Sequence, residues 1–298
     1  MSLLKTMATA SLIFSASINS FAADKPKLSF STTEVAPGIY MLMGVGGFTG
    51  GNIGLSVGED GVVMIDDSMP PMLEIMKTAI KTVTDKPVDY LINTHVHGDH
   101  TGNNTTMGKQ GATIVAHKNL RINMLTKGIR TKDGTKPMPK AALPVITFSE
   151  EISFHLNGDD AEVFHVANAH TDGDAVIYFK NANVIHTGDT FFNGIFPYID
   201  LNNGGSVDGY IKAQQKVLSI SNEATKIIPG HGPLSNKKEL QTSLAMLIDA
   251  RDKIAKLKAE GKSEDEVVAT NPLAKYHKDW NWEFITTEKM TRQIYKSI

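Results

Sequence analysis

The sequence of 298 residues contains no cysteine. This absence excludes disulfide bonds, a thiolate nucleophile and any zinc site built on sulfur. A metal site in this chain must therefore use nitrogen and oxygen ligands. The chain also lacks an excess of charge of one sign, since 30 basic and 32 acidic residues give a formal net charge of -2. Because no basic patch stands out, we expect no nucleic-acid partner.

Long apolar runs are also scarce, and the N-terminal one has the order of parts of a secretory signal peptide. Lys5 precedes an apolar and small-residue segment from Met7 to Ile18, and Ser20-Phe21-Ala22 has the small-x-small pattern of a cleavage site. The segment is too short to span a bilayer, and no later segment approaches the roughly 20 apolar residues of a membrane helix. We expect residues 1–22 to be a signal peptide cleaved near Ala22, rather than a buried N-terminal helix. The mature chain is then periplasmic or secreted and has no membrane contact.

Hydrophobic patterning predicts two halves of similar order. In the first half, strands are expected at 39–43, 53–57, 62–65, 90–93 and 112–116, with helices after prolines 70 and 71 and over 117–126. In the second half, strands are expected at 145–148, 152–156, 161–166, 175–179, 184–187 and 226–228, with helices over 207–219 and through the C-terminal part. Segment 127–144 is interpreted as the loop between the halves. The order favours an α/β fold in which two sheets pack face to face with helices on both outer sides.

Three histidines and an aspartate fall within six residues, His95-Val96-His97-Gly98-Asp99-His100, directly after the predicted strand 90–93. Residues two apart in an extended segment point the same way, so the first two histidines are aimed at one point. A kink at Gly98 brings Asp99 and His100 to a neighbouring point. Four donors this close together favour a site for two metal ions.

Three later polar residues share one context, because each follows a predicted strand beside glycine or threonine: His170, Asp189 and His231. Imidazole and carboxylate are good zinc ligands, and two zinc ions about 3.5–4 Å apart can hold a bridging hydroxide as a nucleophile. We expect His170 and His231 to complete one site each, and Asp189 to place an oxygen on each ion. The expected ligands of two Zn²⁺ ions are His95, His97, Asp99, His100, His170, Asp189 and His231.

The segment from His95 to His100 resembles the H-x-H-x-D-H motif of the metallo-β-lactamase superfamily. His170, Asp189 and His231 match the remaining ligand positions of that superfamily in order. The resemblance implies an αββα sandwich of two mixed β-sheets over residues 23–298, with the metals at one edge, C-terminal helices and a small-molecule substrate. It favours zinc over iron, since iron enzymes of the family carry glutamate where this chain has His97.

Residues 169–176 and the glycine-rich segment 44–52 resemble exported β-lactamase-type members of subclass B1, the latter matching their flexible flap. One departure is that this subclass has cysteine at the position of Asp189 and, three residues on, a lysine at the position of Phe192. The resemblance implies a hydrolase in which hydroxide attacks a carbonyl and Asp99 orients it, with weak activity on β-lactams. A lactone, ester or thioester hydrolase, a non-catalytic zinc-binding protein and an iron redox centre remain alternatives. The oligomeric state is not predicted.

Aromatic and remaining polar residues complete the expectations. Phe48 and Phe192 are expected to line the substrate pocket, whereas Trp280 and Trp282 are expected in core or docking contacts. Asp66 is expected to cap a helix or to accept a hydrogen bond from a ligand histidine. The other histidines are expected in structural roles or at the surface, and these are His117, His155, His165, His186 and His277.

Overall fold

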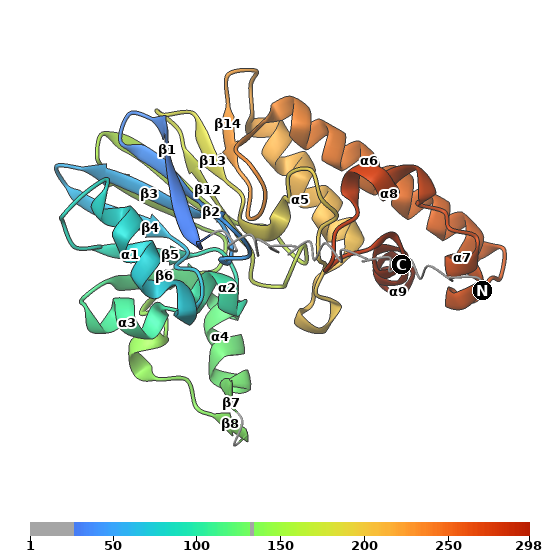
Figure 1. The fold of residues 1–298 in the computed structure, drawn as a ribbon, viewed down its shortest axis with the longest axis horizontal. Helices are drawn as coiled ribbons and strands as arrows, with labels where there is room; N and C mark the ends of the chain where they lie inside the picture. The colour runs from blue at the N-terminus through green and yellow to red at the C-terminus, as the bar shows by residue number, and fades with distance from the viewer. Residues whose placement is uncertain (1–26, 132–133) are drawn as a thin grey trace, which may run out of the picture.

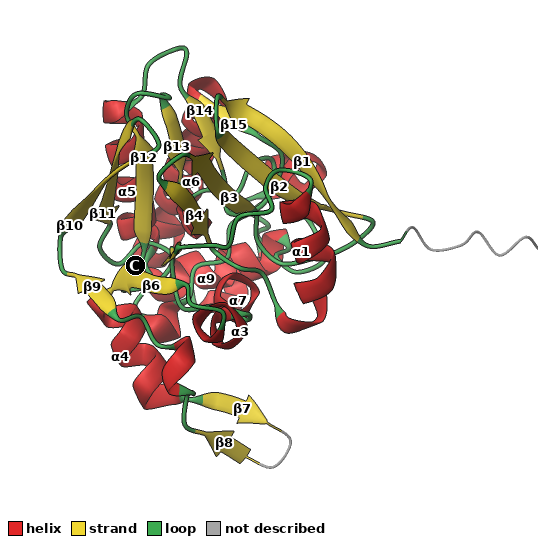
Figure 2. Ribbon diagram, turned by 90° about the vertical axis from the view of Figure 1, so that its left-hand side faces the viewer, coloured by secondary structure: helices red, strands yellow, loops and turns green. Residues whose placement is uncertain are grey.

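The computed structural model describes residues 27–131 and 134–298, so the expected signal peptide lies outside the described residues. Two β-sheets face each other, and helices cover the outer side of each sheet (Figure 1). A two-stranded hairpin, β7 (Ile129–Thr131) with β8 (Gly134–Lys136), projects away from this sandwich (Figure 2).

The first sheet has seven strands in the order β1-β2-β3-β4-β5-β6-β9. The neighbours from β1 to β4 are antiparallel, and those from β4 to β9 are parallel. Helices in the connections allow the parallel pairs, because a parallel neighbour needs a crossover. The strands are β1 (Ser29–Ala36), β2 (Ile39–Val45), β3 (Ile53–Gly58), β4 (Gly61–Ile65), β5 (Tyr90–Asn93), β6 (Thr113–His117) and β9 (Ile146–Phe148).

The second sheet has six strands in the order β10-β11-β12-β13-β14-β15. Only the pair β13–β14 is parallel, and the crossover between these two strands contains helix α5 (Val207–Ile220). The strands are β10 (Glu151–Leu156), β11 (Asp159–His165), β12 (Ala175–Phe179), β13 (Val184–His186), β14 (Lys226–Ile228) and β15 (Ser235–Asn236).

The remaining helices divide between the two outer sides. Those in the first half are α1 (Leu73–Lys81), α2 (Gly98–Thr101), α3 (Asn104–Lys109) and α4 (Lys118–Lys127), and those in the C-terminal part are α6 (Lys237–Ala259), α7 (Glu264–Ala269), α8 (His277–Trp280) and α9 (Thr287–Ser297). Short 3₁₀ turns are η1 (Pro70–Met72), η2 (Lys140–Ala142), η3 (Gly188–Thr190), η4 (Leu201–Asn203) and η5 (Ala274–Tyr276). Over the described ranges, no helix has the length and apolar character that crossing a membrane requires.

Alternating side chains on each strand explain the four layers. On β4, Val63 and Ile65 pack between the sheets, whereas Val62 and Met64 pack outward against α1. In the second sheet, Val184 joins the inner cluster, and its neighbour Ile185 packs with α5. Successive side chains of a strand point to opposite faces, so a strand that is buried on both faces has a continuous run of apolar residues in its sequence. The predicted αββα sandwich is therefore confirmed.

Two segments differ from the sequence prediction. No strand is predicted before Ile39, but the residues there form β1, which buries Phe30 against the outer cluster and Val35 between the sheets. Segment 127–144 was expected to be a loop, but it contains the hairpin β7–β8 and the turn η2. Both segments are rich in polar residues and have no apolar pattern of their own. Their strands form by pairing with adjacent strands of the same chain.

Candidate metal centre

The seven expected metal ligands lie at one edge of the sandwich, and both sheets contribute to them. His95 and His97 follow the end of β5, and Asp99 and His100 lie in the short helix α2. The remaining three come from the second sheet. His170 lies between β11 and β12, Asp189 lies in η3 after β13, and His231 follows β14. Loops at the carboxyl ends of β5, β11, β13 and β14 thus place the donors together.

The first donor group consists of His95, His97, His170 and Asp189, whose ligand atoms lie within 4.8 Å of one another. His97 Nδ1 is 3.2 Å from His95 Nε2 and 2.8 Å from His170 Nε2. Asp189 Oδ2 is 3.3 Å from His170 Nε2. Three ring nitrogens and one carboxylate oxygen therefore face a common point.

The second donor group consists of Asp99, His100 and His231. His100 Nε2 and His231 Nε2 are 3.4 Å apart, and Asp99 Oδ2 is 3.4 Å from His231 Nε2. The other oxygen of Asp189, Oδ1, lies 3.1 Å from His100 Nε2. Asp189 thus directs one oxygen at each donor group, as the sequence predicts for a shared ligand.

These distances fit a metal better than they fit hydrogen bonds. Within each facing pair of ring nitrogens, one nitrogen at most can donate, so a cation between the rings is needed to use all the lone pairs. Ligands of a tetrahedral zinc at about 2.0–2.1 Å lie about 3.3 Å from one another, close to the spacings here. Asp189 Oδ1 is also buried without a hydrogen-bond donor. The nitrogen and oxygen donors suit zinc.

The outer ring nitrogens of three histidines have acceptors, and this fixes the tautomer and the orientation of each ring. The pairs are His100 Nδ1 with Asp66 Oδ2 at 2.7 Å, His97 Nε2 with Asp200 Oδ2 at 2.9 Å and His170 Nδ1 with the Tyr198 carbonyl at 2.7 Å. The role expected for Asp66 is confirmed. Asp200 and Tyr198 were not identified from the sequence, where no spacing links them to the histidines.

The electrostatics of the site favour bound cations. Burial opposes the charge of Asp99, but His100 and His231 hold the pKa of this carboxyl at about 2. Burial likewise opposes the charge of His231, yet Asp189 and Asp99 raise its pKa to about 9. The carboxylates are therefore ionised and attract protons onto neighbouring imidazoles, and metal ions would replace those protons.

The family model described as "Metallo-beta-lactamase superfamily" matches residues 46–260, which include all seven donors. The chain belongs to the metallo-β-lactamase superfamily. Together with the His/Asp donor groups, this membership supports a metal-dependent hydrolase that acts on a small molecule.

Two relatives of this chain differ in the activities that their names give. The chain is 30% identical over 161 residues to a hydroxyacylglutathione hydrolase of Pelagibacter ubique, covering 52% of this chain and 57% of the relative. It is 27% identical over 140 residues to the 2,4-dinitroanisole O-demethylase subunit alpha of Nocardioides, covering 46% and 40%. The chain thus spans about half the length of these curated relatives or less.

Two solved structures show the same fold. A metallo-β-lactamase from Pontibacter korlensis matches with a TM-score of 0.62 at 19% identity, covering 74% of this chain and 100% of that one. The sec-alkylsulfatase Pisa1 from Pseudomonas matches with a TM-score of 0.65 at 16% identity, covering 90% of this chain and 50% of that one.

A cavity of about 950 Å³ adjoins the donors of this superfamily member. His97, Asp99 and His231 reach its wall, and so do Phe48 and Phe192, the two aromatic residues predicted to line it. The rings of Phe48 and Phe192 lie 5.9 and 4.7 Å from the His231 ring. Both side chains are thus placed to contact a substrate at the donor groups.

Three further cavity residues come from the C-terminal part, Trp282, Glu283 and Phe284. Trp280 and Trp282 both pack against the core beneath the C-terminal helices, as expected, and Trp282 in addition lines the cavity. The C-terminal segment follows a long stretch of helix, so no sequence signal brings it to the donors. The five histidines expected outside the metal site join neither donor group within the described ranges.

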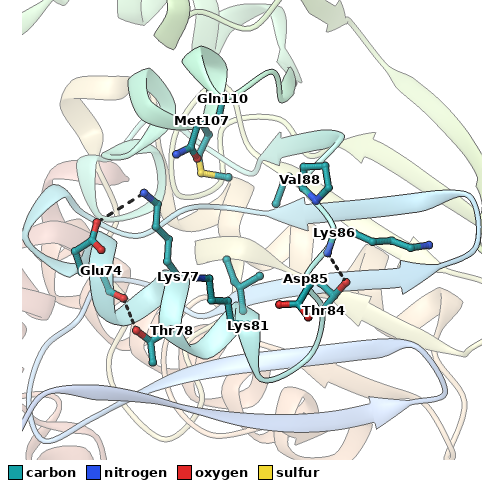
Figure 3. Close-up of a pocket in the computed structure, with 12 residues that line it drawn as sticks. Glu74, Lys77, Thr78, Lys81, Thr84, Asp85, Lys86, Val88, Met107 and Gln110 are labelled. Carbon is teal, nitrogen blue, oxygen red and sulfur yellow. Dashed lines mark hydrogen bonds and ion pairs between the residues drawn. The ribbon is translucent and has the colours of Figure 1, made fainter.

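A second cavity, of about 320 Å³, lies beside α1 (Figure 3). Charged and polar side chains line it together with apolar residues such as Ile80 and Met107, and Lys77 pairs with Glu74 at 3.7 Å within it. Figure 3 shows the Lys86 amine extending away from Asp85 and Thr84. This cavity has no cluster of metal donors in the described part of the chain, so the metal centre is the candidate functional site.

Proposed function

We propose that this chain is an exported dinuclear zinc hydrolase whose ligands are the seven donors described above. Asp189 carries the proposal, because its two oxygens serve both donor groups at the wall of a large cavity. A single-ion site needs no such shared carboxylate. When bound, zinc lowers the pKa of water toward 7 and polarises a substrate carbonyl.

The protein's own residues orient the reactants. Asp99 reaches the cavity and remains ionised at neutral pH, so its carboxylate can hold and align a water proton beside the substrate carbonyl. Asp66 and Asp200 hold the rings of His100 and His97 in place. The rings of Phe48 and Phe192 cover apolar parts of the substrate and limit the access of water.

The proposed substrate is a carbonyl compound with a C–N or C–O bond to cleave. β-Lactams fit this class, and we expect weak turnover of them. A β-lactam carries a carboxylate, and none of the described residues that line the cavity is lysine or arginine. The same observation favours a second candidate, a lactone, ester or thioester without that carboxylate.

A substrate panel separates these possibilities. Zinc-loaded protein is assayed with a chromogenic β-lactam, an aryl ester, a lactone and a thioester. We expect at least one to be hydrolysed, with activity lost on chelation and restored by zinc. Two bound zinc ions with no turnover of any panel member would instead indicate a zinc-binding protein, and native iron would indicate a redox centre.

Export is proposed from residues 1–22 alone. We expect the mature protein in the periplasmic fraction, beginning near residue 23. N-terminal sequencing of protein released by osmotic shock tests this, and an uncleaved cytoplasmic product would contradict it.

A further inference from the structure

Aromatic rings form a continuous arc around the open side of the donor groups. Phe284 lies 5.5 Å from Trp282 and 5.4 Å from Tyr198, measured between ring centroids. Trp282 in turn lies 6.4 Å from Phe192. Tyr198 lies 5.8 Å from the ring of His97. A substrate that reaches the donors therefore passes rings supplied by the C-terminal segment.

This C-terminal wall, defined as Trp282, Glu283 and Phe284, is anchored at several points. Trp282 Nε1 donates to the Phe196 carbonyl at 2.9 Å, and Lys289 Nζ donates to the Phe284 carbonyl at 2.8 Å. Ile285, the next residue, is only 2% exposed and belongs to the core beneath the C-terminal helices. The wall is thus held against the cavity by the fold rather than lying loose beside it.

The charges on this side of the cavity are negative. Glu283 is exposed and makes no hydrogen bond or ion pair with any described residue, so its carboxylate is available to a ligand. Asp200, the residue directly before η4, lines the same cavity. Lys289, although it contacts Phe284, is not among the lining residues.

The wall also lies outside the part of the chain that the superfamily model matches, which ends at residue 260. All seven donors lie inside the matched range, whereas this wall lies beyond its end. Such an added segment beside a shared reaction centre is suited to selecting the substrate.

We propose that the C-terminal wall selects substrates by charge and shape. It takes a planar apolar group without negative charge, and it binds that group more tightly when the group carries an ammonium. Aromatic faces combined with an unpaired carboxylate are the surroundings that attract organic cations. A carboxylate on the same group meets Glu283 and is repelled. This inference rests on the proposed function, because it names the substrate class of the same site.

Binding of three benzyl probes to zinc-loaded protein tests the proposal without requiring turnover. The probes are benzyltrimethylammonium, benzyl alcohol and phenylacetate, and Kd is measured by calorimetry. Glu283→Lys should weaken benzyltrimethylammonium about tenfold, strengthen phenylacetate several-fold and leave benzyl alcohol within about twofold. Phe284→Ala should weaken benzyl alcohol about fivefold. Glu260→Lys, at an exposed acid at the end of α6, is the matched control and should change nothing.

The variants are compared at equal zinc content, so that any direct contact of phenylacetate with the metal contributes equally to each measured Kd. An unchanged cation-to-anion affinity ratio in Glu283→Lys would overturn the charge selection, and unchanged benzyl alcohol affinity in Phe284→Ala would overturn the apolar wall. The expected affinity changes in a protein that hydrolyses no panel substrate would support the wall and count against the hydrolase. Hydrolysis with unchanged ratios would do the reverse.

Discussion

Of the two carboxylate donors, Asp99 is the one more exposed to the cavity. Its side chain is 23% exposed, whereas Asp189 is 4% exposed. Replacing Asp99 by alanine should lower bound zinc from two ions toward one, because the second group then keeps only two imidazoles of its own. Hydrolysis should fall by at least about 100-fold.

Metal analysis and initial rates on the same preparation measure both effects of Asp99→Ala. Asp160→Ala removes an exposed carboxylate that pairs with a surface histidine, and it serves as control. Retention of two zinc ions and full activity by Asp99→Ala would show that Asp99 is not a ligand.

Asp200 is not one of the seven donors, but it contacts the donor His97 and orients its ring. Its Oδ2 accepts from His97 Nε2 at 2.9 Å and also from the side chain of Asn203. Asp200→Ala leaves the outer ring nitrogen of His97 without this acceptor, so zinc affinity should fall about 10–100-fold. Competition with a chromophoric chelator measures the affinity. Asp200→Asn keeps an acceptor oxygen and should lose less, and equal losses in the two variants would argue against this role.

At the residue scale, the cluster of donors was predictable, whereas the residues that orient the donor side chains largely were not. Four of the seven donors lie within the motif from His95 to His100, and the other three each follow an apolar strand beside glycine or threonine. Asp66 was predictable because it follows a strand directly. Tyr198 and Asp200 were not, since only the folded loop after η3 brings them to His97 and His170.

At the element scale, the two sheets meet in a stacked pair of histidines. His117 ends β6 of the first sheet and His165 ends β11 of the second, with ring centroids 3.8 Å apart and planes 4° apart. Burial, reinforced by His165, lowers the pKa of His117 to about 4, and burial also lowers the pKa of His165. Both rings are therefore unprotonated at neutral pH.

This stack predicts a loss of stability in mild acid. The unfolded histidines titrate near pH 6.5 and the folded ones lower, so the unfolded state binds more protons between pH 6.5 and about 4. The free energy of unfolding should therefore fall as the pH falls through this window. His165→Phe keeps a ring on His117 and takes up no proton, so its loss should be smaller, by on the order of 1 kcal/mol after solvent screening.

Urea unfolding of wild type and His165→Phe at pH 7 and pH 5 measures the difference. His155→Phe, at an exposed position outside the stack, is the control and should behave as wild type does. The same pH dependence in His165→Phe and wild type would remove the stack as its cause.

Elements with strong apolar patterns were predicted well, and those without were not. Helix α5 was expected over 207–219 and spans Val207–Ile220, because its apolar residues repeat with helical spacing. Strand β14 was expected over 226–228 and is found there. By contrast, β1 has the sequence SFSTTEVA and owes its pairing to β2. The C-terminal segment likewise reaches the cavity only through packing of α6 to α9.

At the scale of the whole molecule, the donors connect two halves that also meet through apolar packing, the His117–His165 stack and hydrogen bonds such as that from Asn52 Nδ2 to the Pro229 carbonyl. The first sheet supplies His95, His97, Asp99 and His100, and the second supplies the rest. Metal bound at this edge holds both sheets, so it should stabilise the folded state as a ligand does. At a hundredfold excess over Kd, each site contributes about 2.7 kcal/mol. With about 2–4 °C per kcal/mol, removing both ions should lower Tm by at least about 10 °C.

Calorimetry with and without a chelator measures this shift, and added zinc should restore the original Tm. His170→Ala leaves the first group incomplete and should show a smaller shift, which separates bound metal from a general effect of the chelator. An unchanged Tm after removal of two measured zinc ions would show that the donors do not link the two sheets. His97 and Asp189 come from different sheets and belong to the same donor group. The fall in Tm and the loss of activity should therefore appear together as zinc is removed.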